Sequence, residues 1–110
     1  MSHYADYLRE RLGKHVLETE HGFAVFFEIP EERAIYIEDI FVEKDHRETG
    51  VASQMADAIA EAAKEDGFQF LLGSVNPKTH GATRSLRVLL GYGMQLSHVK
   101  DGLIWFKKEL

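Results

Sequence analysis

The chain has 110 residues, of which 45% are hydrophobic and 28% are charged, and its formal net charge is -5. This length supports one hydrophobic core, so we expect a single domain over residues 1–110. The negative charge argues against nucleic acid as a partner, because duplex binding draws on clustered lysine and arginine. Cysteine is absent, which excludes a disulfide framework and fits a cytoplasmic protein. No apolar run resembles a signal peptide or is long enough for a membrane span.

The first half of the chain predicts a short helix followed by strands. Residues 4–12 carry apolar side chains at four-residue intervals, with Ser2 as the candidate N-cap and Gly13 as the candidate stop. Residues 15–29 are typical of a hairpin of two strands. Residues 34–42 are rich in β-branched and aromatic side chains, which predicts a strong strand.

The second half alternates between helical and strand patterns. A helix with a largely alanine stripe is expected between Gly50 and Gly67. A strand, a second helix closed by Gly91 and two final strands follow, over residues 68–75, 81–90, 94–99 and 103–110. The strand–helix–strand unit implies a parallel pair, and the flanking hairpins imply antiparallel neighbours. We therefore predict an α/β (α+β) fold with a mixed, mostly antiparallel sheet and helices on both faces.

The segment DHRETGVAS, residues 45–53, stands between the strand over residues 34–42 and the alanine-rich helix. A helix amino terminus has unpaired N–H groups and about half a positive charge, so it attracts phosphate. Gly50 leaves room for an anion to approach, and Arg47 and Thr49 carry additional donors. The segment lacks the Gly-Lys-Ser/Thr of a triphosphate loop and the three spaced glycines of a dinucleotide fold. Alone, it is more typical of a plain turn before a helix.

In its strand-to-helix setting, the segment resembles the acetyl-coenzyme A signature of the GNAT superfamily of N-acetyltransferases. That signature is Arg or Gln, two residues, Gly, one residue, Gly or Ala, and it is matched by Arg47, Gly50 and Ala52, with Val42 five positions earlier. Residues 74–93, SVNPKTHGATRSLRVLLGYG, resemble the second signature, in which an asparagine ends a strand before a helix that stops at Gly-Phe or Gly-Tyr. The resemblance covers residues 36–110.

The resemblance implies that the chain binds acetyl-coenzyme A (acetyl-CoA) and transfers its acetyl group to a primary amine, on a small molecule or a protein, by direct attack. In this family the strand ending at Val42 splays from the strand ending at Val75, and the pantetheine arm enters the gap. The residues that the resemblance assigns to the cofactor are Ile40, Phe41, Val42, Arg47, Glu48, Thr49, Gly50, Val51, Ala52, Ser53 and Asn76. For Asn76, the alternative is a residue that only caps a turn before Pro77.

Two departures from the family pattern bear on the chemistry, in addition to the minor one of Lys44 where proline is common. Glu48 stands where the family often has glycine, so its charge lies near the diphosphate unless the side chain points outward. Arg87 stands where many members keep a tyrosine that protonates the departing thiolate. An arginine stays charged and cannot act as a general acid. Arg87 is therefore either a fixed positive charge that stabilises the thiolate or a solvated residue beside Arg84.

Glu38 is the candidate catalytic base. Alkyl amines with a pKa near ~10 are mostly protonated at neutral pH, so a base or proton relay assists the attack. Glu38 matches the place where some family members hold a glutamate base, and strand alternation puts it on the face of Ile40 and Val42. The alternative is a carboxylate on the wet face of a sheet.

The remaining expectations concern metals, the acceptor and partners. No metal site is expected, because the six histidines show no ligand spacing along the chain; His46 and His80 lie in loops near the proposed cofactor. The chain is short before the cofactor strand, in the region that helps build the acceptor pocket in the family. The acceptor site is thus shallow, completed by a second subunit in a homodimer, or suited to a large substrate. The chief rival is a catalytically weak or inactive regulatory module that keeps the fold and binds acyl-CoA.

Overall fold

The computed structural model describes residues 2–110. The elements run α1 (His3–Leu12), β1 (His15–Thr19), β2 (Gly22–Ile29), η1 (Pro30–Glu32), β3 (Ala34–Val42), η2 (Lys44–His46), α2 (Val51–Glu65), β4 (Phe70–Val75), α3 (Ala82–Gly91), β5 (Gln95–Lys100) and β6 (Leu103–Glu109). The expected order of helices and strands is confirmed. Within residues 2–110, no helix combines the length and the apolar character that crossing a membrane requires.

The ends of the first two helices follow from single residues. The Ser2 hydroxyl accepts a hydrogen bond from the Ala5 amide and caps α1. Gly13 ends α1 in the left-handed region with φ 67°, and Gly67 follows α2 with φ 88°, as expected. At the end of α3 the positive φ belongs to Gly93 rather than to Gly91, so the helix continues through Gly91 before it stops.

The six strands form one sheet in the order β1-β2-β3-β4-β6-β5. Neighbouring strands are antiparallel except for β3 and β4, which are parallel and are joined through α2. The mixed, mostly antiparallel sheet is therefore confirmed.

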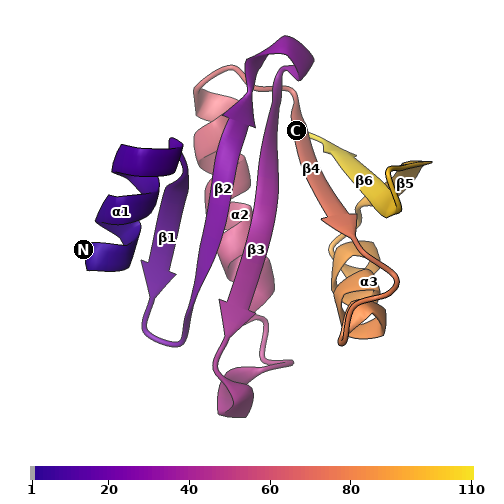
Figure 1. Cartoon of the computed structure of the whole chain (residues 1–110), viewed down its shortest axis with the longest axis horizontal. Helices are drawn as coiled ribbons and strands as arrows, with labels where there is room; N and C mark the ends of the chain where they lie inside the picture. The colour runs from indigo at the N-terminus through magenta and orange to yellow at the C-terminus, as the bar shows by residue number, and fades with distance from the viewer. Residues whose placement is uncertain (1) are drawn as a thin grey trace.

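Helices cover both faces of this sheet. Met55 and Ile59 of α2 pack into a core with Leu71 of β4 and other apolar strand residues, and α2 lies behind β2 and β3 in Figure 1. α3 packs on the same face further along the sheet, against Phe106 and its neighbours. On the opposite face, the Tyr4 ring of α1 meets the Phe23 ring edge-on at 5.8 Å. The prediction of helices on both faces is confirmed.

The parallel strands β3 and β4 form a fork. They pair only from Ala34 with Phe70 to Tyr36 with Leu72. Beyond that point the strands diverge toward their carboxyl ends, and Figure 1 shows the widening gap between them. β3 keeps its pairing with β2, and β4 keeps its pairing with β6. The edges of β3 and β4 that face each other there carry no ladder hydrogen bonds, so the expected splay is present.

Candidate active site

The loop between β3 and α2 presents a row of unpaired backbone N–H groups. α2 begins at Val51 with Gly50 as its N-cap, and its first hydrogen bond runs from the Gln54 amide to the Gly50 carbonyl at 3.0 Å. Within residues 2–110, none of the amides of residues 47–53 donates a hydrogen bond of ordinary length and angle. Such a cluster of amides at a helix amino terminus binds anions.

Side chains attach this loop to the end of β3. The Arg47 Nε donates to the Val42 carbonyl at 2.9 Å, and the guanidinium carbon lies 5.8 Å from the centre of the Phe41 ring. The Thr49 hydroxyl donates to the His46 carbonyl. The terminal nitrogens of Arg47 have no partner within residues 2–110 and remain available to a ligand. Thr49 instead uses its hydroxyl to close the loop.

Two residues of the loop adopt the left-handed backbone region. Gly50 has φ 90°, and a Cβ built on it meets no atom within 4 Å. The glycine is therefore required by its backbone angle and leaves open space next to the amides. Glu48 has φ 65°, an angle that a residue with a side chain adopts at a cost. This angle gives a physical reason why the family often has glycine at this position. The Glu48 side chain is exposed.

A hydroxyl pair closes the narrow end of the fork. The Tyr36 hydroxyl and Ser74 Oγ are 2.6 Å apart and connect β3 to β4 just beyond their last backbone pair. The Tyr36 ring lies 5.1 Å from Phe27 and 5.4 Å from Trp105. The Trp105 Nε1 is buried without a hydrogen-bond partner within residues 2–110. Neither Tyr36 nor Ser74 is singled out by the sequence, because only the pairing of β3 with β4 brings their hydroxyls together.

A bulge in β3 changes the orientation expected for Glu38. Val25 pairs with Asp39, but Phe26 pairs with Ile37, so Glu38 is the extra residue. Ile37 and Ile40 are three residues apart and both pack on the α2 core, which uninterrupted alternation forbids.

The prediction that Glu38 shares a face with Ile40 and Val42 is therefore wrong. Its two carboxylate oxygens lie 2.7 and 2.8 Å from Lys14 Nζ, and that ammonium lies 5.7 Å from the centre of the Phe27 ring. Because Phe27 packs against Tyr36, Glu38 lies on the face of the sheet that carries these two rings, opposite α2. We call this face the aromatic side of the fork. Both of its oxygens are occupied by Lys14.

The other predicted site residues lie on β3, directly after β4 and on α3. Ile40 and Val42 pack toward α2, whereas Phe41 is 45% exposed. Asn76 follows β4, and its Oδ1 accepts a 3.0 Å hydrogen bond from the Lys78 amide, so it caps the turn. Its carboxamide nitrogen has no partner within residues 2–110. Arg87 lies on α3, where it is exposed and has no partner in the same range.

Tyr92 connects the two helices that border the fork. Its hydroxyl donates a 2.7 Å hydrogen bond to Asp57 Oδ1 of α2, and its carbonyl accepts a 2.9 Å bond from Lys108 Nζ of β6. Burial raises the pKa of Tyr92 above its ordinary value, and the hydrogen bond and charge of Asp57 raise it further. The sequence offers Tyr92 only as a helix-stop residue, so this contact is a property of the fold.

A cavity lies beside the amide loop. Its volume is about 290 Å³, and it separates the β1–β2 turn from the first turns of α2. Its walls include Thr19 and His21 on the hairpin and Val51 and Gln54 on the helix. Space for a ligand is therefore present next to the start of α2.

Comparisons with known proteins agree with this architecture. The model of the Acetyltransferase (GNAT) family matches residues 4–92. A search of curated protein sequences found no significant match. Similar solved structures include a GNAT family acetyltransferase from Elizabethkingia anophelis with acetyl-CoA bound, at 15% identity and a TM-score of 0.73, covering 96% of this chain and 82% of that one. A Bacillus subtilis acetyltransferase in complex with CoA has 14% identity and a TM-score of 0.72, covering 96% and 83%.

A third similar structure is longer than this chain. The PaiA N-acetyltransferase from Thermoplasma acidophilum, in complex with coenzyme A, has 9% identity and a TM-score of 0.71. The match covers 82% of this chain and 54% of that one, so the chain spans about half the length of that relative. At these identities the structural likeness establishes the fold.

Proposed function

The chain belongs to the Acetyltransferase (GNAT) family, and we propose that it is an N-acetyltransferase that moves an acetyl group from acetyl-CoA to a primary amine by direct attack. The observation that carries this proposal is the row of free amides of residues 47–53 at the start of α2, next to the open fork between β3 and β4. The bound acetyl-CoA and CoA in the E. anophelis and B. subtilis relatives support the choice of cofactor.

We propose that the cofactor binds both the row of free amides and the open fork. Its diphosphate binds the free amides and the terminal nitrogens of Arg47. Its pantetheine arm extends along the unpaired edge of β3 near Ile40, Phe41 and Val42, as an added strand does at a sheet edge. Asn76 faces this arm from β4 with its carboxamide nitrogen. The acetyl group then lies toward the bulge at Glu38 and the narrow end of the fork.

The reaction requires a neutral amine at the thioester. The amine nitrogen attacks the carbonyl carbon and forms a tetrahedral intermediate, whose collapse breaks the C–S bond and releases the CoA thiolate. The proton lost by the nitrogen goes to a base, for which Glu38 is the candidate on the aromatic side of the fork. Because Lys14 holds both Glu38 oxygens, an incoming ammonium competes with Lys14 for the same carboxylate.

Two groups are candidates for stabilising or protonating the departing thiolate. Arg87 supplies a fixed positive charge if its long side chain reaches the sulfur. Tyr36 carries a phenol proton and is held by Ser74 at the narrow end of the fork. A phenol can act as a general acid, which an arginine cannot. We therefore add Tyr36 to Arg87 as a candidate for the role that a tyrosine on the helix plays in many family members.

A catalytically weak or inactive acyl-CoA-binding module is the second candidate function. It is favoured by the ion pair that occupies Glu38 and by the arginine at position 87. A thiol-release assay with a panel of alkyl amines, polyamines and peptides distinguishes the two functions. Release that depends on an amine supports the transferase and identifies the acceptor class. Binding of acetyl-CoA without release for any amine supports the regulatory module.

Ligand-induced thermal stabilisation tests the cofactor site itself. A ligand at 100 times its Kd stabilises a protein by about 2.7 kcal/mol, so acetyl-CoA should raise the Tm clearly. We expect Gly50→Asp to abolish the shift, because it places a charged side chain beside the amides. Gly67→Asp is the matched control, since Gly67 has φ 88° and equally open surroundings at the other end of α2. No shift of the wild-type protein at millimolar acetyl-CoA would contradict the proposal.

The proposal extends to the compartment, the acceptor and the assembly of the enzyme. We place the enzyme in the cytoplasm, because a chain without cysteine needs no oxidising compartment. The acceptor is a primary amine of a small molecule or a protein. A homodimer that completes the acceptor site is one arrangement to examine by light scattering, alongside a shallow site on the monomer.

A further inference from the structure

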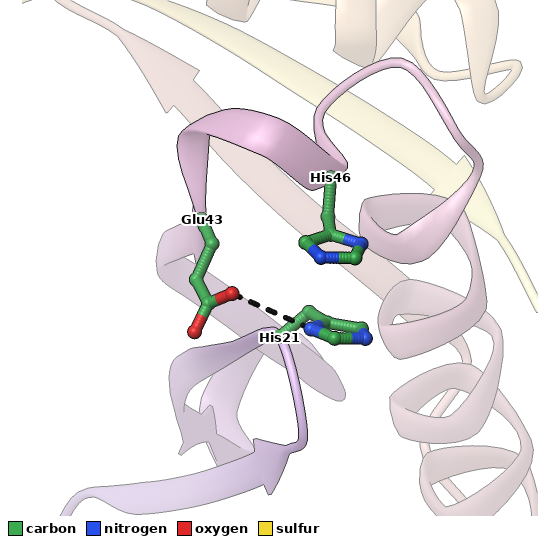
Figure 2. Close-up of side chains that lie close together, drawn as sticks. All are labelled: His21, Glu43 and His46. Atoms are coloured by element: carbon green, nitrogen blue, oxygen red, sulfur yellow. Dashed lines mark hydrogen bonds and ion pairs between the residues drawn. The ribbon is translucent and has the colours of Figure 1, made fainter.

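Three potential metal ligands converge from segments that are distant in sequence. His21 lies in the β1–β2 turn, Glu43 directly follows β3, and His46 ends η2 (Figure 2). One ligand atom from each residue lies within 4.8 Å of the other two. His21 Nδ1 is 3.4 Å from Glu43 Oε2, and the two imidazole rings are stacked with centroids 3.5 Å apart and 10° between their planes.

The backbone holds these three residues in place. The Glu43 amide donates a 2.8 Å hydrogen bond to the His21 carbonyl, which joins the hairpin turn to the end of β3. The His46 amide donates a 2.9 Å bond to the Glu43 carbonyl and forms η2. The three side chains project toward one another, as Figure 2 shows, from segments that these backbone hydrogen bonds join. Because the three ligand atoms already lie within 4.8 Å of one another, we expect rotations of the side chains to bring them onto one ion.

We propose that His21, Glu43 and His46 bind a divalent transition-metal ion of the Zn²⁺ type. Two imidazole nitrogens and one carboxylate oxygen are a donor set that Zn²⁺ accepts, with a water completing the tetrahedron. Metal–ligand bonds of about 2.0–2.2 Å place two donors of one tetrahedral ion about 3.3 Å apart. The 3.4 Å separation of His21 Nδ1 and Glu43 Oε2 already fits this geometry. His46 reaches the same point by turning its ring out of the stack.

Glu20 lies near enough to His21 to supply the outer contact of such a site after a small shift of its exposed side chain. Its Oε2 lies 3.8 Å from His21 Nε2, the ring nitrogen that faces away from Glu43. Histidines that bind metals through one nitrogen commonly donate the N–H of the other to a carboxylate, which fixes the tautomer. With the metal on Nδ1 of His21, the remaining proton sits on Nε2, the nitrogen nearest to Glu20.

The donor chemistry also determines which ions are excluded. Mg²⁺ and Ca²⁺ prefer sites made of oxygen ligands, so two imidazoles disfavour both. Zn²⁺, Co²⁺ and Ni²⁺ accept imidazole readily. The absence of ligand spacing along the chain led to the expectation of no metal site, because His21 is far in sequence from the other two residues. The folded hairpin removes that separation.

Titration of tag-free, metal-stripped protein tests the site. We expect Zn²⁺ to bind at one ion per chain by calorimetry, Co²⁺ to give the visible absorption of a tetrahedral nitrogen–oxygen site, and Mg²⁺ to give no signal. Glu43→Gln and His21→Gln should each weaken Zn²⁺ binding by at least about 100-fold, since even outer-contact mutations cost 10- to 100-fold. His80→Gln is the matched control, because His80 is an exposed loop histidine without a partner within residues 2–110.

The outcomes separate the site from its alternatives. Circular dichroism of each metal-free variant establishes that it is folded, and His46→Gln replaces any variant that is not. Tight Zn²⁺ binding that is lost in the cluster variants and kept in His80→Gln supports the proposal. Wild-type binding below one ion per chain overturns it, as does equal affinity in wild type and His21→Gln. Either of these results would mean that the three residues form only a stacked, hydrogen-bonded surface cluster.

Discussion

The hydroxyl of Tyr92 donates a 2.7 Å hydrogen bond to Asp57, and this contact ties the end of α3 to the middle of α2. α2 carries the amide loop at its start, while α3 follows β4 along the chain. Lys108 of β6 adds a bond to the Tyr92 carbonyl at 2.9 Å. One residue thus connects the elements on the two sides of the fork, and its removal should loosen the fork without touching the cofactor loop.

Tyr92→Phe removes this hydrogen bond and keeps the ring. We expect the free energy of unfolding at pH 7 to fall by about 1 kcal/mol, as for a typical intramolecular hydrogen bond. Chemical denaturation measures this change. Tyr7→Phe is the control, because Tyr7 is 53% exposed and has no hydrogen-bond partner within residues 2–110.

The stability difference between wild type and Tyr92→Phe should depend on pH in the alkaline range. Burial, reinforced by Asp57, raises the pKa of folded Tyr92 above the unfolded value of 10.0. The neutral phenol therefore contributes its full stability below about pH 10 and loses it as the pH rises further. We expect the stability difference between wild type and Tyr92→Phe to shrink above pH 10. A difference that stays constant from pH 8 to the onset of alkaline unfolding would contradict this linkage.

Local signals in the sequence predict the order of elements and the position of the amide loop. Ser2 and Gly13 bound α1 because a hydroxyl caps free amides and a glycine adopts a positive φ, and both effects act within a few residues. Gly50 marks the start of α2 for the same reason. The cofactor loop could therefore be predicted from its own residues and their resemblance to a family.

Features that depend on partners across the sheet could not be predicted in this way. The bulge at Glu38 appears only when β3 is paired with β2, and it reverses which side chains face α2. The Tyr36–Ser74 pair depends on the register of β3 and β4. His21 and His46 meet because a backbone hydrogen bond joins a hairpin turn to the end of a strand. No local period in the sequence carries this information.

Glu48→Gly should improve the cofactor loop. Glycine relieves the positive φ of 65° but adds entropy to the unfolded chain, so the net gain in stability should stay within about 1 kcal/mol. Removing a charge beside the diphosphate is worth about 1 kcal/mol at contact in water, so acetyl-CoA should bind on the order of 5-fold more tightly. Calorimetric titration with acetyl-CoA measures the affinity.

Two controls separate strain from charge at this position. Glu48→Gln removes the charge and keeps the side chain, so it should retain most of the gain in affinity. Arg33→Gly relieves a φ of 54° in the turn before β3 and should leave the affinity unchanged. An affinity of Glu48→Gly equal to that of wild type would show that the glutamate points away from the bound diphosphate.

Glu38→Gln tests the proposed base. If Glu38 accepts the amine proton, turnover should fall by about 100-fold or more, while the affinity for acetyl-CoA stays the same. Asp39→Asn is the control, because it removes the neighbouring carboxylate of the same strand. Steady-state rates across a range of pH provide the measurement. Turnover of Glu38→Gln that matches wild type at every pH would remove Glu38 from the mechanism and leave it as the partner of Lys14.

A comparison of Arg87→Ala with Tyr36→Phe tests which of the two residues stabilises or protonates the departing thiolate. Loss of the group that stabilises or protonates the thiolate should lower kcat by at least about 10-fold with little change in cofactor affinity. Arg84→Ala is the control for Arg87, since it removes an exposed arginine one turn earlier on α3. Single-turnover kinetics with acetyl-CoA and the best acceptor separate the chemical step from release. Unchanged rates in both variants would mean that solvent water, rather than either side chain, stabilises the departing thiolate.

Metal and cofactor should bind cooperatively if both sites exist. His46 is a ligand of the proposed ion, and its carbonyl accepts the Thr49 hydroxyl inside the amide loop. An ion that fixes His46 therefore favours the loop conformation with free amides. We expect saturating Zn²⁺ to tighten acetyl-CoA binding by about 5-fold or more, and acetyl-CoA to tighten Zn²⁺ binding by the same factor, because coupling is reciprocal.

Calorimetric titrations of each ligand with and without the other measure both factors. Glu43→Gln should abolish the coupling while it keeps cofactor binding. If each ligand binds with the same affinity in the presence and absence of the other, the ion joins the hairpin turn to the end of β3 without influencing the amide loop.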